Sequence, residues 1–286
     1  YGRNPYIKLQ WMRNTDKIPN QTLFISNLLF EDFTKNSFLE MLRSVCVSSR
    51  GGFVLFSADF EGNGRSVHSI SGLLTALIDI SKRSVGSPVS YIAMNSVAIT
   101  IIQSEETGIK VILFHDVNYY RVLAHRVGTE IMRAFTEKFP PSIYNSTDSS
   151  IFKHFNSCLG PAIRSASSSL LHSLIERLRG AIQFSVVFSD GDAIFTYPSN
   201  ANSLSVAASL QALQFSVQEI ADITNDQPYE LTIEGPQIIT QVVLFGTTTV
   251  ILQIRADYHS AQIRLEVSET LEMLKLCFMT SEGLMA

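Results

Sequence analysis

The stretch that decides the fold is Ser90–His115, which reads SYIAMNSVAITIIQSEETGIKVILFH. It contains three short apolar runs with the length and the Ile and Val content that favour β-strands. The runs are Ser90–Asn95, Val97–Gln103 and Lys110–His115. Between the last two runs, Ser104–Gly108 has the polar residues and the glycine of a hairpin loop. We therefore predict three consecutive strands in one antiparallel sheet.

Helical spacing is found on both sides of this stretch. Tyr120–Phe139 predicts a long closing helix, which Pro140 and Pro141 end because proline cannot continue a helix. Ser69–Ser81 predicts a shorter helix before the strands. Its apolar residues can share one face: Ile70, Leu73, Leu74, Leu77 and Ile78.

Two further elements are predicted upstream of this helix. Phe53–Ser57 is a short apolar strand, and Glu61–Gly64 is a turn with residues that accept positive φ. Ser37–Val47 is a predicted helix, since it is followed by Gly51 and Gly52 and its apolar residues recur at helical spacing. These residues are Phe38, Leu39, Leu42 and Val45.

The same order of elements returns in the second half of the chain. After a predicted helix at Ser165–Leu178, two strands are joined by a turn with an Asp-Gly step. A helix, three strands and a closing helix follow. The predicted ranges are Ala181–Phe188, Ala193–Tyr197, Leu204–Ile223, Tyr229–Glu234, Gln237–Phe245, Thr249–Asp257 and Ala261–Thr280. The repeat lies in the order of elements, since residue identity between the halves is low.

This order predicts an α+β fold with two consecutive units. Each unit is expected to hold a five-stranded antiparallel sheet in the order 2-1-5-4-3, with helices packed against it. The predicted division is an N-terminal arm at 1–36, a first unit at 37–141, a linker at 142–164 and a second unit at 165–286. The linker is expected to contain a helical turn at Ile151–Phe155. The arm either packs on the body or serves as a partner-binding strand or peptide.

Composition narrows the classes of function. Hydrophobic residues make up 45% and charged residues 17% of the 286, which is typical of a chain that buries a core. A net charge of −4 argues against nucleic acid as the main partner, because binding its backbone needs clustered Lys and Arg. No apolar run reaches the ~20 residues of a membrane helix. Three widely spaced cysteines suit a reducing compartment, so we expect a cytoplasmic protein.

The sequence offers no convincing chemical site. His115 and Asp116 end a strand, where a polar turn is the favoured interpretation, and no nucleophile elbow accompanies them. His154 and Cys158 supply two metal ligands at most, whereas structural zinc needs four. No phosphate-binding or dinucleotide-binding glycine motif occurs. We expect no cofactor, no metal and no catalytic residues, and therefore a chain that is not an enzyme.

The order ββαβββα resembles the longin fold and, with a leading helix, the roadblock fold. Two such units in one chain resemble the tri-longin proteins of the Mon–Ccz and Fuzzy/Inturned group. The resemblance is carried by residues 50–280, and within them by three passages. These are Phe53–Ser57 with Gly72–Leu77, the strands from Ser90 to His115, and the helix Tyr120–Phe139 followed by Ser169–Leu174. That group has a third unit after the second, for which these 286 residues hold no counterpart.

The resemblance implies a non-enzymatic scaffold or adaptor subunit in small-GTPase-linked membrane trafficking. Its partners would be a related longin or roadblock subunit and a small GTPase, with peripheral association with endomembranes through them. One alternative is a subunit of a heterodimeric guanine-nucleotide exchange factor for a Rab-type GTPase, and another is a structural component of a ciliary or microtubule assembly. The candidate partner-binding residues lie on two helices whose apolar positions spread wider than one stripe: Ile70, Leu73, Leu77, Leu213, Phe215 and Ile220.

Overall fold

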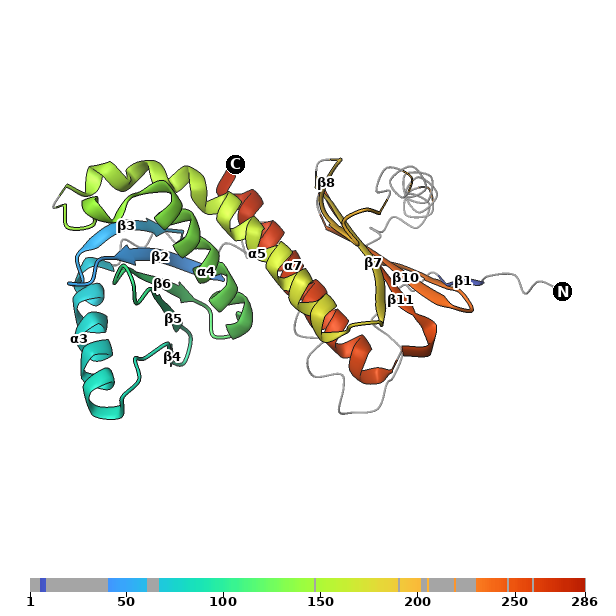
Figure 1. Cartoon of the computed structure of the whole chain (residues 1–286), viewed down its shortest axis with the longest axis horizontal. Coiled ribbons are helices and arrows are strands. Elements are labelled where there is room, and N and C mark those ends of the chain that lie inside the picture. The colour runs from blue at the N-terminus through green and yellow to red at the C-terminus, as the bar shows by residue number, and fades with distance from the viewer. Residues whose placement is uncertain are drawn as a thin grey trace. The chain divides into compact units, whose positions relative to one another are not determined.

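The structure, a computed structural model, contains two compact units (Figure 1). It describes residues 6–8, 41–60, 67–146, 148–189, 191–201, 205, 219, 230–245, 247–258 and 260–285. The first unit comprises Phe24–Leu170 and Leu276–Ala286, and the second comprises Tyr1–Leu23 and Leu171–Lys275. None of the described helices is both long enough and apolar enough to cross a membrane.

The first unit is built on a five-stranded antiparallel sheet in the order β3-β2-β6-β5-β4. This is the predicted order 2-1-5-4-3. The strands are β2 (Leu42–Ser48), β3 (Val54–Asp59), β4 (Tyr91–Ala93), β5 (Ala98–Gln103) and β6 (Lys110–His115). The predicted hairpin loop joins β5 to β6, which pair from Ala98 opposite His115 to Gln103 opposite Lys110.

Helices cover both faces of this sheet (Figure 1). Helix α3 (Val67–Val85) packs on one face over a core formed by Cys46, Leu74, Ile78, Ile99, Ile101 and Ile112. Helix α4 (Arg121–Lys138) packs on β5 and β6 at the other face, with a buried stripe that includes Leu123, Val127, Ile131 and Phe135. The stripe predicted for α3 is confirmed for Leu74 and Ile78 only, because Leu73 and Leu77 of the same prediction are exposed. Helices thus pack on both faces of the sheet.

The predicted helix at Ser37–Val47 is wrong for the part that the structure describes. Leu42–Ser48 forms β2, which pairs with β3 on one side and β6 on the other. A central strand is buried on both faces, so its apolar residues run continuously instead of alternating. Leu42 and Val45 therefore fit helical spacing by coincidence, and pairing on both edges decides the conformation. Residues 37–40 lie outside the described part.

The described residues of the predicted linker, 142–146 and 148–164, include helical segments that pack on the first unit. After the short η1 (Pro141–Ile143), the expected helical turn is present as η2 (Ser149–Phe155), and α5 (Asn156–Arg177) follows directly. Phe152 and Phe155 are fully buried. Phe155 packs edge-on against Phe56 of β3 with ring centroids 5.1 Å apart, and Phe152 stacks on Phe135 of α4 at 5.6 Å. The segment therefore belongs to the core of the first unit.

The second unit repeats the sheet. Its strands are β7 (Ile182–Ser189), β8 (Asp192–Tyr197), β9 (Glu230–Glu234), β10 (Ile238–Phe245) and β11 (Thr248–Arg255). Their order, β9-β10-β11-β7-β8, is again 2-1-5-4-3 read from the other edge. The predicted turn between β7 and β8 is present, with Gly191 at φ +89° and Ser189 paired with Asp192. The order of strands is therefore shared by both units.

One strand of the second sheet was not predicted. β1 (Tyr6–Lys8), within the segment expected to be an arm, pairs antiparallel with β9 and makes the sheet six-stranded. The predicted helix Leu204–Ile223 lies outside the described residues, except that Ser205 and Glu219 are helical. The turn η3 (Ala256–Tyr258) and helix α7 (Ala261–Met285) complete the unit.

Helices α5 and α7 each contribute to both units. α5 divides between Leu170 and Leu171, and α7 divides between Lys275 and Leu276. The last turns of α7 bring Cys277 and Phe278 into the first unit, where both are buried. Burial, and then the neighbouring Cys277, raise the pKa of Tyr119 in that core. The boundaries drawn from the sequence at residues 37, 141 and 165 remain a prediction.

A candidate protein-binding surface on helix α3

The inner face of α3 is fixed to the sheet by apolar and polar contacts together. Leu74 and Ile78 are buried in the core, and Ser71 and Thr75 are buried beside them. The Ser71 hydroxyl donates to the carbonyl of Gly52, 3.0 Å away in the turn between β2 and β3. Residues at spacings of three and four share one side of a helix. These four positions therefore define the side of α3 that faces the sheet.

Lys110 of β6 also helps to hold α3 on the sheet. Its side chain is buried, and Nζ donates to the carbonyl of Arg50 at 2.9 Å, to that of Ser49 at 3.3 Å and to Thr75 Oγ1 at 3.3 Å. Burial lowers the pKa of Lys110, because desolvation disfavours the ammonium; the charge of Asp79 opposes this effect. One buried amine thus joins β6, the β2–β3 turn and α3, which holds the helix in one position.

The outer face of α3 carries a second apolar stripe. Leu73 is 72% exposed, Leu77 is 42% exposed and Ile80 is 60% exposed. Their spacing of four and three residues places them in one row on the side opposite the core. We call Leu73, Leu77 and Ile80 the outer stripe. Single exposed apolar residues are normal, whereas a row at helical spacing is typical of a surface that another protein covers.

Gly72 lies beside the outer stripe, and no neighbour in the described part of the unit requires a glycine there. A Cβ added there would have no other atom within 4 Å. Gly52 differs, since it has φ +85° and its Cβ would stand 2.9 Å from Thr75 Oγ1. Glycine inside a helix costs about 1 kcal/mol relative to alanine. No contact among the described residues accounts for that cost at Gly72.

A cavity of about 470 Å³ adjoins the N-terminal end of α3 in the first unit. Ile70, half-buried, lines it from the helix. Its other walls come from the strands and the β4–β5 turn: Arg43, Ser44, Asp59, Met94, Asn95, Ser96, Val97, Ile99 and Phe114. The cavity and the outer stripe therefore lie on neighbouring sides of one helix.

The structure places three of the six candidate binding residues. Leu73 and Leu77 are exposed in the outer stripe, and Ile70 lines the cavity. Leu213, Phe215 and Ile220 lie outside the described residues. Sequence reasoning missed Ile80, although its position three residues after Leu77 gives the necessary signal. A partner for any of these residues stays a prediction.

His115 occupies a buried site in which both ring nitrogens are engaged. Nδ1 lies 2.8 Å from the carbonyl of Asp116, and Nε2 lies 2.9 Å from Thr100 Oγ1. A neutral ring that donates from Nδ1 and accepts from the Thr100 hydroxyl satisfies both contacts. Burial lowers the pKa of His115, and the hydrogen bond to the Asp116 carbonyl opposes this effect. This arrangement holds the strand end in place and leaves no free nitrogen for proton transfer.

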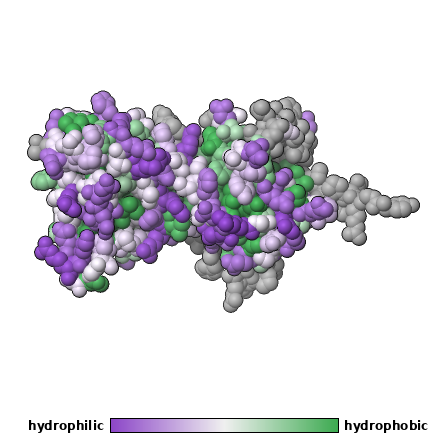
Figure 2. All heavy atoms as spheres, in the orientation of Figure 1, coloured by the Kyte–Doolittle hydropathy of each residue, from purple (hydrophilic) through white to green (hydrophobic). Residues whose placement is uncertain are grey.

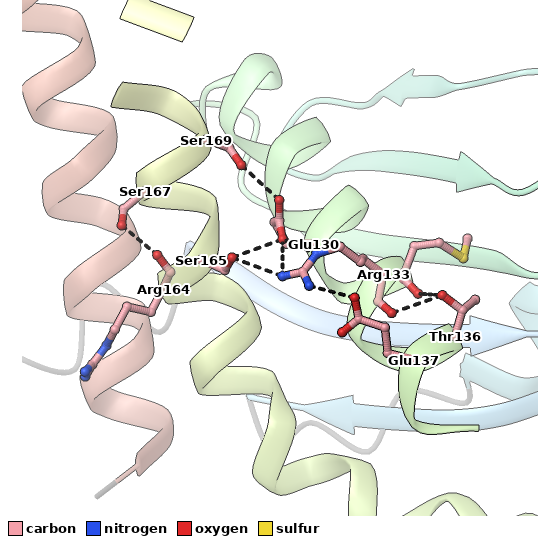
Figure 3. A network of polar contacts seen from close by, with 9 residues as sticks. Glu130, Arg133, Thr136, Glu137, Arg164, Ser165, Ser167 and Ser169 are labelled. Atoms are coloured by element: carbon pink, nitrogen blue, oxygen red, sulfur yellow. Dashed lines mark hydrogen bonds and ion pairs between the residues drawn. The ribbon is translucent and has the colours of Figure 1, made fainter. Parts of the chain in front are cut away.

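A polar network joins α4 to α5 in the first unit (Figure 3). Glu130 Oε1 accepts from the Ser169 hydroxyl at 2.9 Å, and Oε2 accepts from the Ser165 hydroxyl at 3.1 Å. Arg133 Nε donates to Oε2 of Glu130 at 2.9 Å, and its Nη1 donates to Glu137 at 2.8 Å. Burial would raise the pKa of Glu130, but hydrogen bonds from Arg133 and the two serines lower it. The network fixes the position of α5 on α4.

The remaining candidate ligands do not form a metal site. Cys158 Sγ lies 3.2 Å from Lys138 Nζ, which also donates to the carbonyl of His154 at 2.7 Å. His154 therefore contacts this group through its backbone. In the part of the chain that the structure describes, no group of three or more His, Cys, Asp or Glu could hold a metal ion. Figure 2 shows mostly polar side chains over the first unit on the face drawn, with apolar ones in separate spots.

Comparison with known proteins gives similarity in structure only. No protein-family model matches the chain, and no curated protein matches it. Myxococcus xanthus MglB is similar at a TM-score of 0.37 and 11% identity, over 41% of this chain and 91% of that one. The gliding protein MglB of Thermus thermophilus is similar at 0.33 and 13%, over 39% and 90%. Scores this low do not by themselves establish a common fold. The fold is assigned instead from the observed strand order 2-1-5-4-3, which both units share and which is the order expected for longin- and roadblock-like units.

Proposed function

We propose that this chain is a non-enzymatic adaptor subunit that binds a partner protein through the outer stripe of α3. The observation that supports the proposal is that α3 has apolar side chains on both its inner and its outer face. Leu74 and Ile78 fill the core, while Leu73 and Ile80 extend into solvent from the same element. A helix on the surface of a monomer needs one apolar face only. The second face is accounted for if another protein covers it.

The outer stripe can supply useful binding energy. Fully burying a Leu or Ile side chain stabilises by roughly 1.5–3 kcal/mol relative to leaving it exposed. Most binding energy in interfaces comes from a few such residues surrounded by contacts that exclude water. The helix beneath is held by Lys110 and the core, so little order has to be gained on binding. Preorganisation of this kind favours a specific partner.

The proposed partners are a related longin or roadblock-type subunit and, through the resulting assembly, a small GTPase. The strand order of both units supports this choice, because it is the order on which the resemblance to those families rests. A role without bond-breaking chemistry fits His115, which has both nitrogens engaged, and the described residues, which form no metal group. A subunit of a heterodimeric exchange factor is the alternative, in which the assembly would also accelerate nucleotide release from the GTPase.

The test compares the full chain with three variants, purified from its native cells with whatever it binds. Leu73→Asp and Ile80→Asp place a carboxylate in the outer stripe. Val122→Asp, at a position of α4 that is 58% exposed, is the matched control. Complex size is measured by light scattering after size exclusion. We expect the two stripe variants to lose the partner and the control to retain it. Equal retention by all three would refute the proposal.

A second measurement separates the adaptor from the exchange factor. Nucleotide release from candidate small GTPases is followed with the chain alone and with its co-purified partner. An adaptor leaves the release rate unchanged, whereas an exchange-factor subunit accelerates release in the assembly. Loss of this acceleration in Leu73→Asp would mean that the exchange activity requires the complex formed through α3.

A further inference from the structure

The end of α4 and the start of α5 bring a sulfur and an amine into direct contact. Cys158 Sγ lies 3.2 Å from Lys138 Nζ, although the two residues are 20 apart in the chain. We infer that hydrogen peroxide drives this pair to form a covalent sulfur–nitrogen bridge, which ties α5 to α4 and is opened again by thiols. The modification lies within the first unit and is independent of the outer stripe.

The aromatic core beneath the pair fixes both residues in position. Phe139, which follows Lys138, packs against Phe152 and Phe155 of η2 with ring centroids 5.1 Å and 6.2 Å apart. All three rings are buried. Cys158 stands three residues after Phe155, in the first turn of α5. The backbones that carry the sulfur and the amine are therefore held together by packing that neither reacting group supplies.

The amine of Lys138 is itself oriented toward the start of α5. Its Nζ donates to the carbonyl of His154 at 2.7 Å, and it lies 5.9 Å from the centre of the Phe139 ring. These contacts keep the nitrogen beside the sulfur. A nucleophile that is already in place loses little freedom when the bond forms, and such placement accelerates a reaction.

Exposure selects Cys158 from the three cysteines. Cys158 is partly exposed and Lys138 is exposed, whereas Cys46 and Cys277 are buried. Burial raises the pKa of the Cys46 thiol to about 12, which keeps it in its unreactive form. Accessible cysteines beside a positive charge are the ones that peroxide oxidises first. The two buried cysteines serve as internal controls in the same chain.

The reaction proceeds in two steps. The sulfur of Cys158 attacks one oxygen of hydrogen peroxide and the O–O bond breaks, which gives a sulfenic acid and one water. The Lys138 amine, after its ammonium has released a proton to solvent, then attacks the sulfur. The S–N bond forms, the S–O bond breaks, and the hydroxyl leaves as a second water with a proton from the nitrogen. Sulfenic acids condense in the same way with a backbone nitrogen.

The whole reaction oxidises the sulfur by two electrons and reduces one peroxide to two waters, so the protein loses two hydrogen atoms. A thiol reverses it by attacking the sulfur, which releases the amine and leaves a mixed disulfide that a second thiol reduces. The bridge closes the chain from 138 to 158, which includes the buried Phe152 and Phe155. Closing a loop restricts the unfolded chain. The bridged protein should therefore have a higher denaturation midpoint than the reduced one.

The experiment treats the full chain with hydrogen peroxide, digests it with trypsin and maps the peptides by mass spectrometry. Trypsin cuts after Lys and Arg, but it cannot cut after Lys138 once the amine is bridged. The expected product joins residues 134–153 to residues 154–164, with two hydrogen atoms fewer than the two free peptides together. Dithiothreitol before digestion should restore cleavage at Lys138. Cys46 and Cys277 should remain unmodified.

Two lysine variants test which amine reacts. Lys138→Arg keeps the positive charge, but a guanidinium stays protonated and cannot attack. This variant should form no joined peptide, and its Cys158 should be trapped by dimedone as the sulfenic acid. Lys153→Arg, an exposed position of η2, is the matched control and should bridge like the wild type.

A joined peptide that persists in Lys138→Arg, or is lost in Lys153→Arg, would overturn the inference. So would wild-type Cys158 that ends as a dimedone adduct or a sulfinic acid with no joined peptide. Partner binding through the outer stripe is measured separately, so these outcomes leave the proposed function standing.

Discussion

Gly128 of α4 lies so close to Ile102 of β5 that a Cβ on Gly128 would stand 2.6 Å from Cγ1 of Ile102. Both residues belong to the first unit, and the contact sets how near the helix comes to the sheet. Alanine is the better helix former by about 1 kcal/mol. Overpacking a core costs about 1–3 kcal/mol, so we expect Gly128→Ala to destabilise the unit by about 1 kcal/mol. Urea denaturation followed by circular dichroism measures the change.

Gly72→Ala is the matched control for that substitution. It makes the same chemical change inside a helix, but in open space. The expected effect has the opposite sign, a stabilisation of about 0.5–1 kcal/mol. If both variants moved in the same direction, the close approach at Gly128 would not be the reason for its glycine.

Two neighbouring leucines of α3 are expected to respond differently to the same change. Leu74 is 5% exposed, so Leu74→Asp buries a carboxylate at a cost of several kcal/mol, a large part of the ~5–15 kcal/mol that stabilises a domain. Leu73→Asp should change stability by no more than about 0.5 kcal/mol. Thermal unfolding distinguishes them. A Leu74→Asp variant that melts like the wild type would contradict the assignment of the inner face.

The network around Glu130 predicts a contrast between two glutamates of α4. The Glu130 side chain is 13% exposed and accepts from Arg133, Ser165 and Ser169, whereas the Glu137 side chain is 61% exposed. We expect Glu130→Gln to cost about 1–3 kcal/mol, because charge-assisted hydrogen bonds are lost in a part-buried place. Glu137→Gln should cost less than about 0.5 kcal/mol. Denaturant midpoints of both variants check the difference.

His115 predicts a pH dependence of stability. Its pKa in the folded unit is lowered by burial, so below the ordinary value of about 6.5 the unfolded chain takes up a proton that the folded chain does not. Stability should therefore fall as pH decreases from about 7 through that range. His115→Gln lacks the titrating ring. Denaturation of both proteins between about pH 5 and about pH 8 isolates the pH-dependent stability that His115 contributes. This dependence should disappear in the variant.

The three cysteines are expected to react with alkylating reagents in a fixed order. Cys46 and Cys277 are buried, and burial raises the pKa of the Cys46 thiol to about 12 and that of Cys277 further. Cys158 is partly exposed at the start of α5. Iodoacetamide on the native protein should label Cys158 alone, as seen by peptide mass. Labelling of Cys46 or Cys277 at a similar rate would mean that the first unit opens readily.

The pairing of β5 with β6 and of β10 with β11 could be predicted from the sequence, because short loops such as Ser104–Gly108 bring consecutive strands together. β2 could not, since a central strand with apolar residues on both faces has no alternation to distinguish it from a helix. The burial of Phe152 and Phe155 was also missed. The Ser, Asn and Thr around them are typical of linkers, and only the three-dimensional packing shows what the two rings contact.

The candidate surface was predictable in part. Leu73 and Leu77 follow from helical spacing, and Ile80 could have been added by the same rule. Which side of α3 faces the sheet could not be read from the sequence, because both sides are apolar. The orientation of α3 depends on hydrogen bonds of Lys110 and Ser71, which join residues far apart in the chain. The Glu130 network likewise depends on the position of α5 on α4, which no local pattern encodes.

The course of α7 has a consequence for synthesis on the ribosome. Cys277 and Phe278 belong to the core of the first unit, yet they come near the end of the last described helix. Domains generally fold in order as they emerge, N-terminal first. Here the sheet β3-β2-β6-β5-β4 emerges early, but its core is completed only when α7 has been made. The nascent first unit therefore exposes apolar surface until α7 has emerged from the ribosome, and we expect it to need chaperone protection until then.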